Sequence, residues 1–248
     1  MEKITSRKNP YIVHLRSLAA DGAYRRTQGE FVCDGEKLLR EALASGMRVT
    51  SVLSAGKEAP PDAGRVYFAP RDLVEYASPL KNSPGPVFTV KMTEVPPPER
   101  PKNAVVLEDV QDPGNVGTII RAADALGIET VVLVGECADR WSPRTSRATM
   151  GAVFRQPVVE TDMDGLRAFL SRSGLPLFGA ALCEGAVDIR ELPVGKAAVA
   201  IGNEGSGLSE TLLSLCEKNI VIPMSPRSES LNAAMAATIV MWEMKRPN

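Results

Sequence analysis

The chain has 248 residues, a formal net charge of −1 and 44% hydrophobic side chains, which is enough apolar material for one large α/β domain or two modest ones. These ordinary values exclude disordered and fibrous proteins. No stretch approaches the roughly 18 consecutive apolar residues of a membrane span.

The first part of the chain predicts a small α/β domain over residues 1–95. Apolar residues recur at helical spacing over 36–44, up to Gly46, and again over 72–77. Short apolar runs predict strands over 49–53, 66–68 and 87–90.

A proline-rich segment follows. Pro96, Pro97 and Pro98 are consecutive and Pro101 lies close by. Successive prolines cannot continue a helix and favour an extended, semi-rigid spacer. Residues 96–101 are therefore predicted to be a linker between two domains.

The remainder, residues 102–248, alternates between apolar runs and helical patterns. Such alternation predicts a parallel sheet covered by helices on both faces. The expected strands are 104–107, 130–134, 177–182, 197–201 and 219–222, and the expected helices are 116–126, 164–171, 210–217 and 231–243. Ligands of such sheets bind beyond the carboxyl ends of the strands, so the loops after the strands are the places to search.

The loop after the strand at 104–107 leads into a helix that carries Asn115, Gly117 and Arg121. Positions 117 and 121 share one helix face. Gly117 would leave room for a ligand, and Arg121 offers a fork of donors suited to phosphate. The alternative is a helix capped by Asn115 with a surface arginine.

The loop after the strand at 197–201 contains Gly202, Gly205 and Gly207 and ends at Ser209, which we expect to cap the next helix. The glycines would let a backbone approach a planar ligand closely. Their order is neither the dinucleotide fingerprint nor a Walker A loop, so the sequence disfavours NAD and ATP.

The loop after the strand at 219–222 runs to Ser230, Leu231 and Asn232. Ser230 is a plausible N-cap and Asn232 projects from the first turn of the helix. Taken alone, this is an ordinary capped core helix. The three loops together favour a ligand site, because all of them follow strands of one predicted sheet.

Charge and cysteine usage add two expectations. Six basic and two acidic residues lie within the first 26 positions, and four arginines and no acid lie between 140 and 155. These clusters would neutralise phosphates, or they are simply solvated faces. The chain start lacks an apolar signal core and the cysteines are scattered, which predicts a cytoplasmic protein without a metal site. We expect all four cysteines, Cys33, Cys137, Cys183 and Cys216, to be buried.

Three motifs now identify a family. The first is Asn115-x-Gly117-x-x-x-Arg121, the second Gly202-x-Glu204-x-x-Gly207-Leu208-Ser209, and the third Ile222-Pro223-Met224 followed by Ser230-Leu231-Asn232. In order and spacing, the chain resembles the SpoU/TrmH group of RNA ribose methyltransferases, within the SPOUT superfamily, over essentially its full length. The stretch from Pro143 to Phe154 also looks like the family.

The resemblance implies an S-adenosylmethionine-dependent enzyme that methylates a ribose 2′-hydroxyl of structured RNA, ribosomal RNA being favoured over transfer RNA. It implies a catalytic domain with a C-terminal trefoil knot, preceded by a ribosomal-protein-like RNA-binding domain, and a homodimer whose active site is completed across the interface. The alternatives are a transfer RNA ribose methyltransferase and a catalytically silent RNA-binding relative.

The resemblance also assigns residues. Catalytic roles would fall to Arg121, Asn115, Ser230, Asn232 and Glu204. Contacts to the cofactor would come from Gly202, Ile222, Leu231, Met224, Ile201, Pro223 and Ala181. The two basic clusters described above, and not the resemblance, supply the expected RNA-binding residues, which are Arg7, Lys8, Arg16, Arg25, Arg26, Arg144, Arg147 and Arg155, the last three near the active site. The family's proposed mechanism uses the motif-one arginine as a base. An arginine with a pKa above about 12 is an awkward base, so we favour phosphate binding for Arg121.

Overall fold

The computed structural model describes residues 2–56, 64–81, 83, 85–225, 227 and 230–246. The chain forms two compact units: unit 1 is Met1–Thr93 with Asp139–Arg155, and unit 2 is Glu94–Ala138 with Gln156–Asn248. The first boundary lies at the start of the proline-rich segment. Residues 139–155, which the sequence placed in the second domain, belong to unit 1.

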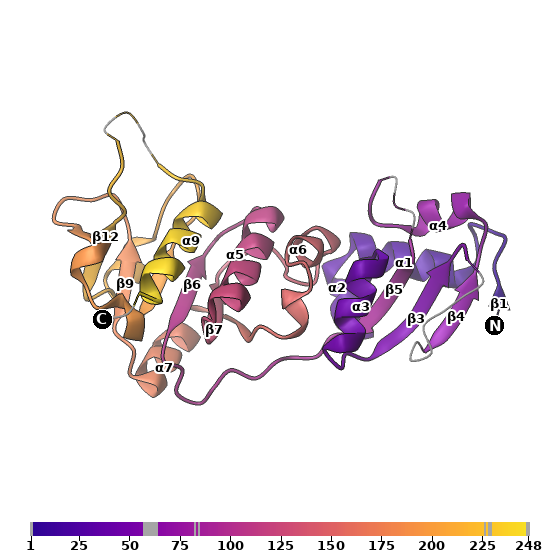
Figure 1. Ribbon diagram of the computed structural model, residues 1–248, viewed down its shortest axis with the longest axis horizontal. Coiled ribbons are helices and arrows are strands. Elements are labelled where there is room, and N and C mark those ends of the chain that lie inside the picture. Colours follow the sequence, from indigo (N-terminus) through magenta and orange to yellow (C-terminus); the bar gives the residue numbers. More distant parts are fainter. Residues whose placement is uncertain are drawn as a thin grey trace. The chain divides into compact units, whose positions relative to one another are not determined.

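Unit 1 is built on a five-stranded mixed sheet in the order β1-β4-β3-β5-β2 (Figure 1). Strand β5 is antiparallel to β2 and β3, and the other pairs are parallel. The strands are β1 (Glu2–Lys3), β2 (Glu30–Asp34), β3 (Val49–Ser54), β4 (Arg65–Phe68) and β5 (Val87–Lys91), and the helices are α1 (Pro10–Ala20), α2 (Gly22–Gln28), α3 (Glu36–Ala44), α4 (Arg71–Ala77), α6 (Pro143–Ala148) and the 3₁₀ turn η1 (Ala152–Phe154).

Both faces of this sheet are covered. Successive residues of a strand point to opposite faces, so neighbours on β2 belong to different core clusters. Phe31 and Cys33 join a core cluster that includes residues of α3 together with Trp141 and Phe154. Val32, between them, joins a second cluster with residues of α1 and α4. The rings of Phe31 and Trp141 lie 4.7 Å apart. Aromatic packing against β2 therefore explains why 139–155 belongs to unit 1.

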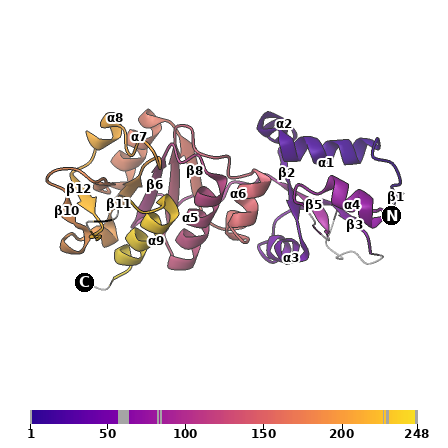
Figure 2. The same ribbon diagram turned by 90° about the horizontal axis from the view of Figure 1, so that it is seen from above.

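Unit 2 contains a seven-stranded sheet, parallel throughout, in the order β10-β12-β9-β11-β6-β7-β8 (Figure 2). Its strands are β6 (Ala104–Glu108), β7 (Thr130–Val134), β8 (Val158–Thr161), β9 (Leu177–Ala180), β10 (Val187–Asp188), β11 (Ala198–Ile201) and β12 (Lys218–Val221). Its helices are α5 (Pro113–Leu126), α7 (Met163–Ser173), α8 (Glu210–Leu213) and α9 (Ala233–Met244), with 3₁₀ turns η2 (Ile189–Glu191) and η3 (Val194–Lys196).

Helices cover both faces of the unit 2 sheet. Val106, Val132 and Leu166 belong to a core cluster formed with residues of α7 and α8. On the other face α5 packs against α9, which also contacts β11. The central strands are apolar on both faces for this reason. The predicted α/β class with a parallel sheet is confirmed.

Several element boundaries differ from the sequence prediction. The helix expected over 231–243 begins two residues later, at Ala233, and the helix expected over 210–217 ends at Leu213. The strand expected over 177–182 ends at Ala180. Strands β2 and β8 and helix α1 were not predicted; the two strands have only two or three consecutive apolar residues each.

Helix α9 is the most apolar helix of unit 2, yet it has only 12 residues. Within the described part of the chain, no helix has the length and apolar character needed to cross a membrane. Three large apolar side chains of α9 are exposed, namely Met235, Ile239 and Trp242. Their spacing of four and three places them on one helix face.

Candidate active site

Three loops of unit 2 meet through side chains at the carboxyl edge of the sheet. Asn115 lies in the first turn of α5, and its Nδ2 donates a hydrogen bond to Oε1 of Glu204 at 2.5 Å. Nδ2 of Asn232, in the loop after β12, donates to Oδ1 of Asn115 at 3.0 Å. Asn115, Glu204 and Asn232 are called here the Asn115 cluster. Each of them comes from a different one of the three sequence motifs.

Asn115 is free for this role because another residue caps its helix. The Asp112 side chain accepts a hydrogen bond from the backbone N–H of Asn115 at 2.9 Å, which satisfies an amide that a helix start leaves without a partner. The alternative reading of Asn115 as the cap is therefore wrong. An amide side chain can donate and accept at once, and Asn115 uses both atoms to link its neighbours.

The glycine loop after β11 folds back on itself. The backbones of Asn203 and Gly207 exchange hydrogen bonds of 3.1 and 3.0 Å. A Cβ at Gly202 would lie 2.3 Å from the carbonyl carbon and oxygen of Gly207. The sequence interpretation assigned the glycines to close approach of a ligand, but at Gly202 the space is filled by the loop itself.

A buried carboxylate holds this loop. Glu108 ends β6 and is 4% exposed. Its oxygens accept hydrogen bonds from the backbone N–H of Ser209 at 2.8 Å and from Ser209 Oγ at 2.6 Å. Ser209 Oγ also accepts from Leu212 N, so the predicted cap of α8 is confirmed. Sequence reasoning missed Glu108; the signal was one acidic residue closing an otherwise apolar strand.

The third loop differs from the sequence prediction at the helix start. Asn232, rather than Ser230, caps α9: its Oδ1 accepts from Ala234 N at 2.9 Å and from Met235 N at 3.3 Å. Ser230 is exposed. Asn232 therefore performs two tasks, since its oxygen caps α9 and its Nδ2 reaches Asn115.

The residues expected to contact the cofactor follow strands β9, β11 and β12. The amide of Ala181 is already used, because it donates to the carbonyl of Ile220 at 3.1 Å. Ile201 is buried at the end of β11, and Pro223 has no amide hydrogen. The other expected contacts are half-buried and their backbone N–H groups donate to no acceptor in the described part of the chain; they are Gly202, Ile222, Met224 and Leu231.

Those amides fit a ligand that is held through backbone contacts. Half-buried N–H groups normally find a partner in protein, water or ligand. Four such donors follow β11 and β12, which are separated in the sheet by β9 alone. This is the donor set that the resemblance implies for S-adenosylmethionine, so the residues present fit the cofactor.

Arg121 is not bonded to the Asn115 cluster. Gly117 is buried within α5, whereas Arg121 is exposed. Among the described residues, Arg121 has no hydrogen bond or ion pair. Its guanidinium therefore has all its donors available to a ligand.

All eight expected RNA-binding residues lie in unit 1. The expectation that Arg144, Arg147 and Arg155 belong to the catalytic domain is therefore not met. Arg7 and Arg16 each lie over the ring of Tyr76, 4.5 Å from its centroid. The exposed members are Arg7, Lys8, Arg16, Arg26, Arg144, Arg147 and Arg155.

Arg25 is the exception and corrects the prediction. It is 5% exposed; its Nη2 donates to Oδ2 of Asp139 at 2.6 Å and its Nη1 to the carbonyl of Leu18 at 2.6 Å. A guanidinium engaged in this way has little left to offer phosphate. Arg25 instead links α2 to Asp139 through this ion pair.

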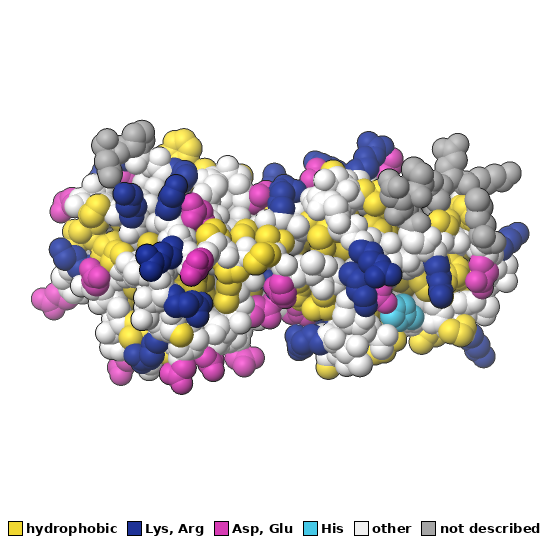
Figure 3. All heavy atoms as spheres, turned by 90° about the horizontal axis from the view of Figure 1, so that it is seen from below, with side chains coloured by type: hydrophobic (Ala, Val, Ile, Leu, Met, Phe, Trp, Pro, Cys, Tyr) yellow, Lys and Arg dark blue, Asp and Glu magenta, His cyan; other side chains and the backbone are white. Residues whose placement is uncertain are grey.

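Basic and acidic side chains are interspersed over the face seen in Figure 3. Arg155 follows this pattern, since its Nη1 lies 3.0 Å from Oε2 of Glu41. Positive and negative side chains are therefore mixed on this face, in keeping with a net charge of −1.

The cysteines and potential metal ligands suggest no further chemistry. Burial raises the pKa of the Cys137 and Cys216 thiols to about 11 and raises that of Cys33 as well. Contrary to expectation, only Cys33 is buried: Cys137 and Cys216 are half-buried and Cys183 is exposed. In the described ranges, no group of three or more His, Cys, Asp or Glu is arranged to hold a metal ion.

Comparison with known proteins identifies the family. The sequence profile of the SpoU rRNA Methylase family matches residues 102–242. The chain belongs to this family. The predicted SpoU/TrmH relationship is confirmed, and with it the methyltransferase class and S-adenosylmethionine as methyl donor.

Two relatives of this SpoU chain match it over nearly its full length. It is 32% identical to the 23S rRNA (guanosine(2553)-2′-O)-methyltransferase RlmP of Bacillus subtilis, covering 99% of this chain and 100% of that protein. It is 30% identical to the 23S rRNA (uridine(2479)-2′-O)-methyltransferase of Streptomyces viridochromogenes, covering 98% and 92%.

Solved structures of the family resemble it throughout. The AdoMet-bound rRNA methyltransferase from Sinorhizobium meliloti superposes with a TM-score of 0.88 at 30% identity, over 98% of this chain and 97% of that one. The SpoU methyltransferase AviRb from Streptomyces viridochromogenes gives 0.83 at 28% identity, over 96% of each chain.

Proposed function

We propose that this SpoU chain transfers a methyl group from S-adenosylmethionine to a ribose 2′-hydroxyl of ribosomal RNA. The observation that carries the proposal is the Asn115 cluster, which joins all three sequence motifs by hydrogen bonds. Both full-length relatives named above are 23S rRNA ribose 2′-O-methyltransferases. Ribosomal RNA also makes the cytoplasm the natural location of the enzyme.

Positioning accounts for most of the catalysis. Bound S-adenosylmethionine supplies a methyl group that its positive sulfonium already activates. The protein must then hold the ribose oxygen in line with the methyl carbon, and orientation of this kind is worth several kcal/mol. Asn115, Glu204 and Asn232 have polar atoms at the edge where the hydroxyl would lie, and Ser230 is two residues from Asn232.

Arg121 serves as the phosphate anchor in this proposal. Its exposed fork can bind the phosphate beside the target ribose in a bidentate manner. Its pKa above about 12 makes proton abstraction unfavourable at neutral pH. Charge and positioning are therefore the contributions we assign to it.

A trefoil knot would explain how the loops are held together. Helix α9 follows β12 in the chain, yet it contacts β11, two strands away in the sheet, and packs against α5. The glycine loop lies against itself at Gly202 and Gly207 and is fastened to Glu108. A chain threaded past a loop of this kind is rare in proteins but is what the family resemblance implies here.

Unit 1, comprising 1–93 with 139–155, is the proposed RNA-binding unit. Its seven exposed basic residues among the predicted set support phosphate contacts that position the RNA. Affinity for RNA should then fall as salt rises, in proportion to the number of phosphates engaged. An affinity that barely changes with salt would mean that these residues are only solvated.

A homodimer is proposed from the exposed face of α9. Met235, Ile239 and Trp242 form an apolar stripe on that face, and Trp242 is 68% exposed. Apolar patches of this kind mark protein interfaces. An interface there would let the exposed Arg121 complete the active site of a second copy. Light scattering of wild type and Trp242→Glu tests it: a dimer that Trp242→Glu converts to monomer is expected.

Methyl transfer tests the function directly. Ribosomal and transfer RNA from a strain lacking the gene are incubated with the protein and tritiated S-adenosylmethionine, and ribose methylation is then mapped. We expect label in one nucleotide of ribosomal RNA. Label in transfer RNA alone would mean that transfer RNA, and not ribosomal RNA, is the substrate. No methyl transfer to either RNA would contradict the proposal.

A further inference from the structure

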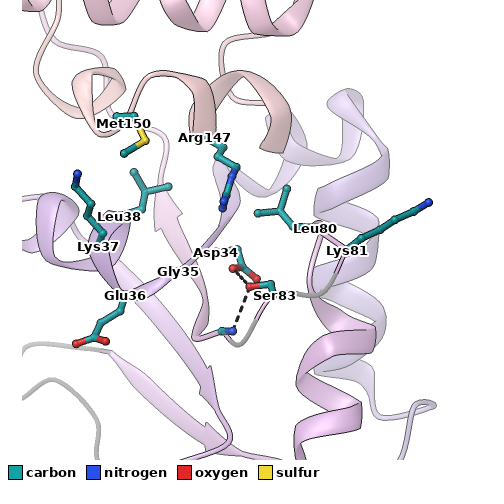
Figure 4. Close-up of a pocket in the computed structure, with 11 residues that line it drawn as sticks. Asp34, Gly35, Glu36, Lys37, Leu38, Leu80, Lys81, Ser83, Arg147 and Met150 are labelled. Atoms are coloured by element: carbon teal, nitrogen blue, oxygen red, sulfur yellow. Dashed lines mark hydrogen bonds between the residues drawn. The ribbon is translucent and has the colours of Figure 1, made fainter.

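A pocket of about 420 Å³ opens in unit 1, and its lining includes none of the residues assigned to methyl transfer (Figure 4). Its volume falls in the range of sites that hold small ligands. It is lined by Asp34, Gly35, Glu36, Lys37 and Leu38, by Leu80, Lys81, Ser83 and Gly85, and by Arg147 and Met150. Arg147 and Met150 belong to segment 139–155, so this segment forms part of the pocket wall.

An acceptor and a donor face each other across this pocket. Asp34, 5% exposed, accepts hydrogen bonds from Ser78 Oγ at 2.6 Å and from Ser83 Oγ. A carboxylate has about four acceptor positions, so each oxygen can accept one more. Arg147 points toward Asp34 (Figure 4), yet no ion pair joins the two, and Arg147 has no ion pair with any other described residue. Both groups remain available to a ligand between them.

The remaining wall is partly apolar, and two lysines, Lys37 and Lys81, also line it. Leu38 and Leu80 present aliphatic surfaces, and Met150 stands at the mouth with 37% of its surface exposed. Met150 has a φ of 51°, in the left-handed region that non-glycine residues rarely adopt. Such outliers concentrate at ligand sites. Lys37 and Met150 both line the pocket, whereas Glu36 extends away from it (Figure 4).

We propose that this pocket binds one unstacked nucleotide of the RNA substrate. The base lies against Leu38, Leu80 and Met150, its N–H groups donate to Asp34, and its phosphate contacts Arg147 and Lys37. Protein sites that read RNA hold unstacked bases in this manner, with one face packed and one edge hydrogen-bonded. The inference rests on the proposed function in one respect, that unit 1 binds RNA.

Binding of deproteinised ribosomal RNA by the full-length protein tests the pocket. Met150→Trp fills the mouth without changing charge, and Arg147→Gln removes the facing donor while leaving an exposed polar side chain. The matched controls are Val13→Trp, on the exposed face of α1, and Arg71→Gln, on the exposed face of α4. Both pocket variants should raise the Kd about tenfold, the scale of losing one base contact, and both controls should bind as wild type.

Ultraviolet cross-linking gives a readout that does not depend on variants. In the wild-type complex, the tryptic peptide 148–155, which carries Met150, should bear a nucleotide adduct. Adducts on other peptides but none on 148–155, or wild-type affinity in Met150→Trp, would overturn the pocket assignment.

The outcomes separate this inference from the proposed function. Weakened RNA binding in both pocket variants, with no methyl transfer by the wild type, would support the pocket and contradict the enzyme. Methyl transfer by the wild type, with unaltered binding and rate in Met150→Trp, would support the enzyme and overturn the pocket. Affinity for S-adenosylmethionine should be the same in all five proteins, because no substituted residue belongs to unit 2.

Discussion

Asn232 and Asn115 are 117 positions apart in the sequence, and their side chains are joined by a hydrogen bond of 3.0 Å between Nδ2 of the former and Oδ1 of the latter. The same Asn232 caps α9 through its oxygen. The start of α9 is thus coupled directly to the start of α5. Anything that moves one helix start changes the geometry of the other.

The two tasks of Asn232 can be separated by substitution. Asn232→Asp keeps the capping oxygens but loses the donor to Asn115, whereas Asn232→Ala loses both. We expect Asn232→Ala to lower the free energy of unfolding by about 1 kcal/mol and Asn232→Asp to leave it nearly unchanged. Both should reduce methyl transfer at least about tenfold. Thermal melts and initial rates measure these effects; full activity in Asn232→Asp would show that the link to Asn115 is dispensable.

Asn115→Asp tests the other side of the cluster. The substitution removes the donor to Glu204 and places two carboxylates side by side, which is unfavourable for both. We expect methyl transfer to fall by about tenfold to about a hundredfold. Asn9→Asp is the control, because Asn9 caps α1 with its side-chain oxygen alone. Equal losses in the two variants would mean a general effect on folding.

Arg121→Lys tests the phosphate-anchor role. Lysine keeps the charge but cannot reproduce the bidentate fork. We expect a large loss of methyl transfer at neutral pH, unchanged affinity for S-adenosylmethionine, and a rate that does not recover as pH rises. Arg167→Lys, on the exposed surface of α7, is the matched control. Near-normal activity of Arg121→Lys would rule out both the anchor and the base.

Glu108→Gln tests the support of the glycine loop. One oxygen of the buried carboxylate becomes an amide group that cannot accept from Ser209, so this buried side chain loses one of its two hydrogen bonds. The expected cost is about 1–3 kcal/mol of stability, with weaker binding of S-adenosylmethionine because Gly202 lies in the same loop. Calorimetry measures both. Glu210→Gln, on the exposed first residue of α8, should change neither.

Glu30 gives unit 1 a predictable response to acid. Burial alone would raise the pKa of Glu30, but hydrogen bonds from His14 and Thr50, at 3.0 and 2.6 Å, lower it below its usual value. A lowered pKa contributes stability that is present above the unfolded value of about 4.3 and is lost as pH falls through the folded value. We expect Glu30→Gln to be less stable than wild type at neutral pH and to lose less stability on acidification. Acid unfolding followed by circular dichroism, with exposed Glu2→Gln as control, measures the difference.

Much of the parallel sheet and the family could be predicted from the sequence. The strand expected over 130–134 matches β7, and the helix expected over 36–44 matches α3, because apolar periodicity is a local property that burial enforces on each segment. Asn115 and Asn232 were found because each lies in a loop that follows a predicted strand, whereas Glu204 was assigned through the family resemblance.

The tertiary structure alone decided which residues cooperate. Packing of Trp141 and Phe154 against β2 assigned 139–155 to unit 1, and this segment contributes Arg147 and Met150 to the pocket of that unit. Arg25, expected to contact RNA, is buried and donates a hydrogen bond to Asp139 instead. Glu108 is buried too, and it accepts a hydrogen bond from a loop residue 101 positions away. The sequence determines which side chains are charged or can form hydrogen bonds. The partners of those side chains depend on which distant segments the cores bring together.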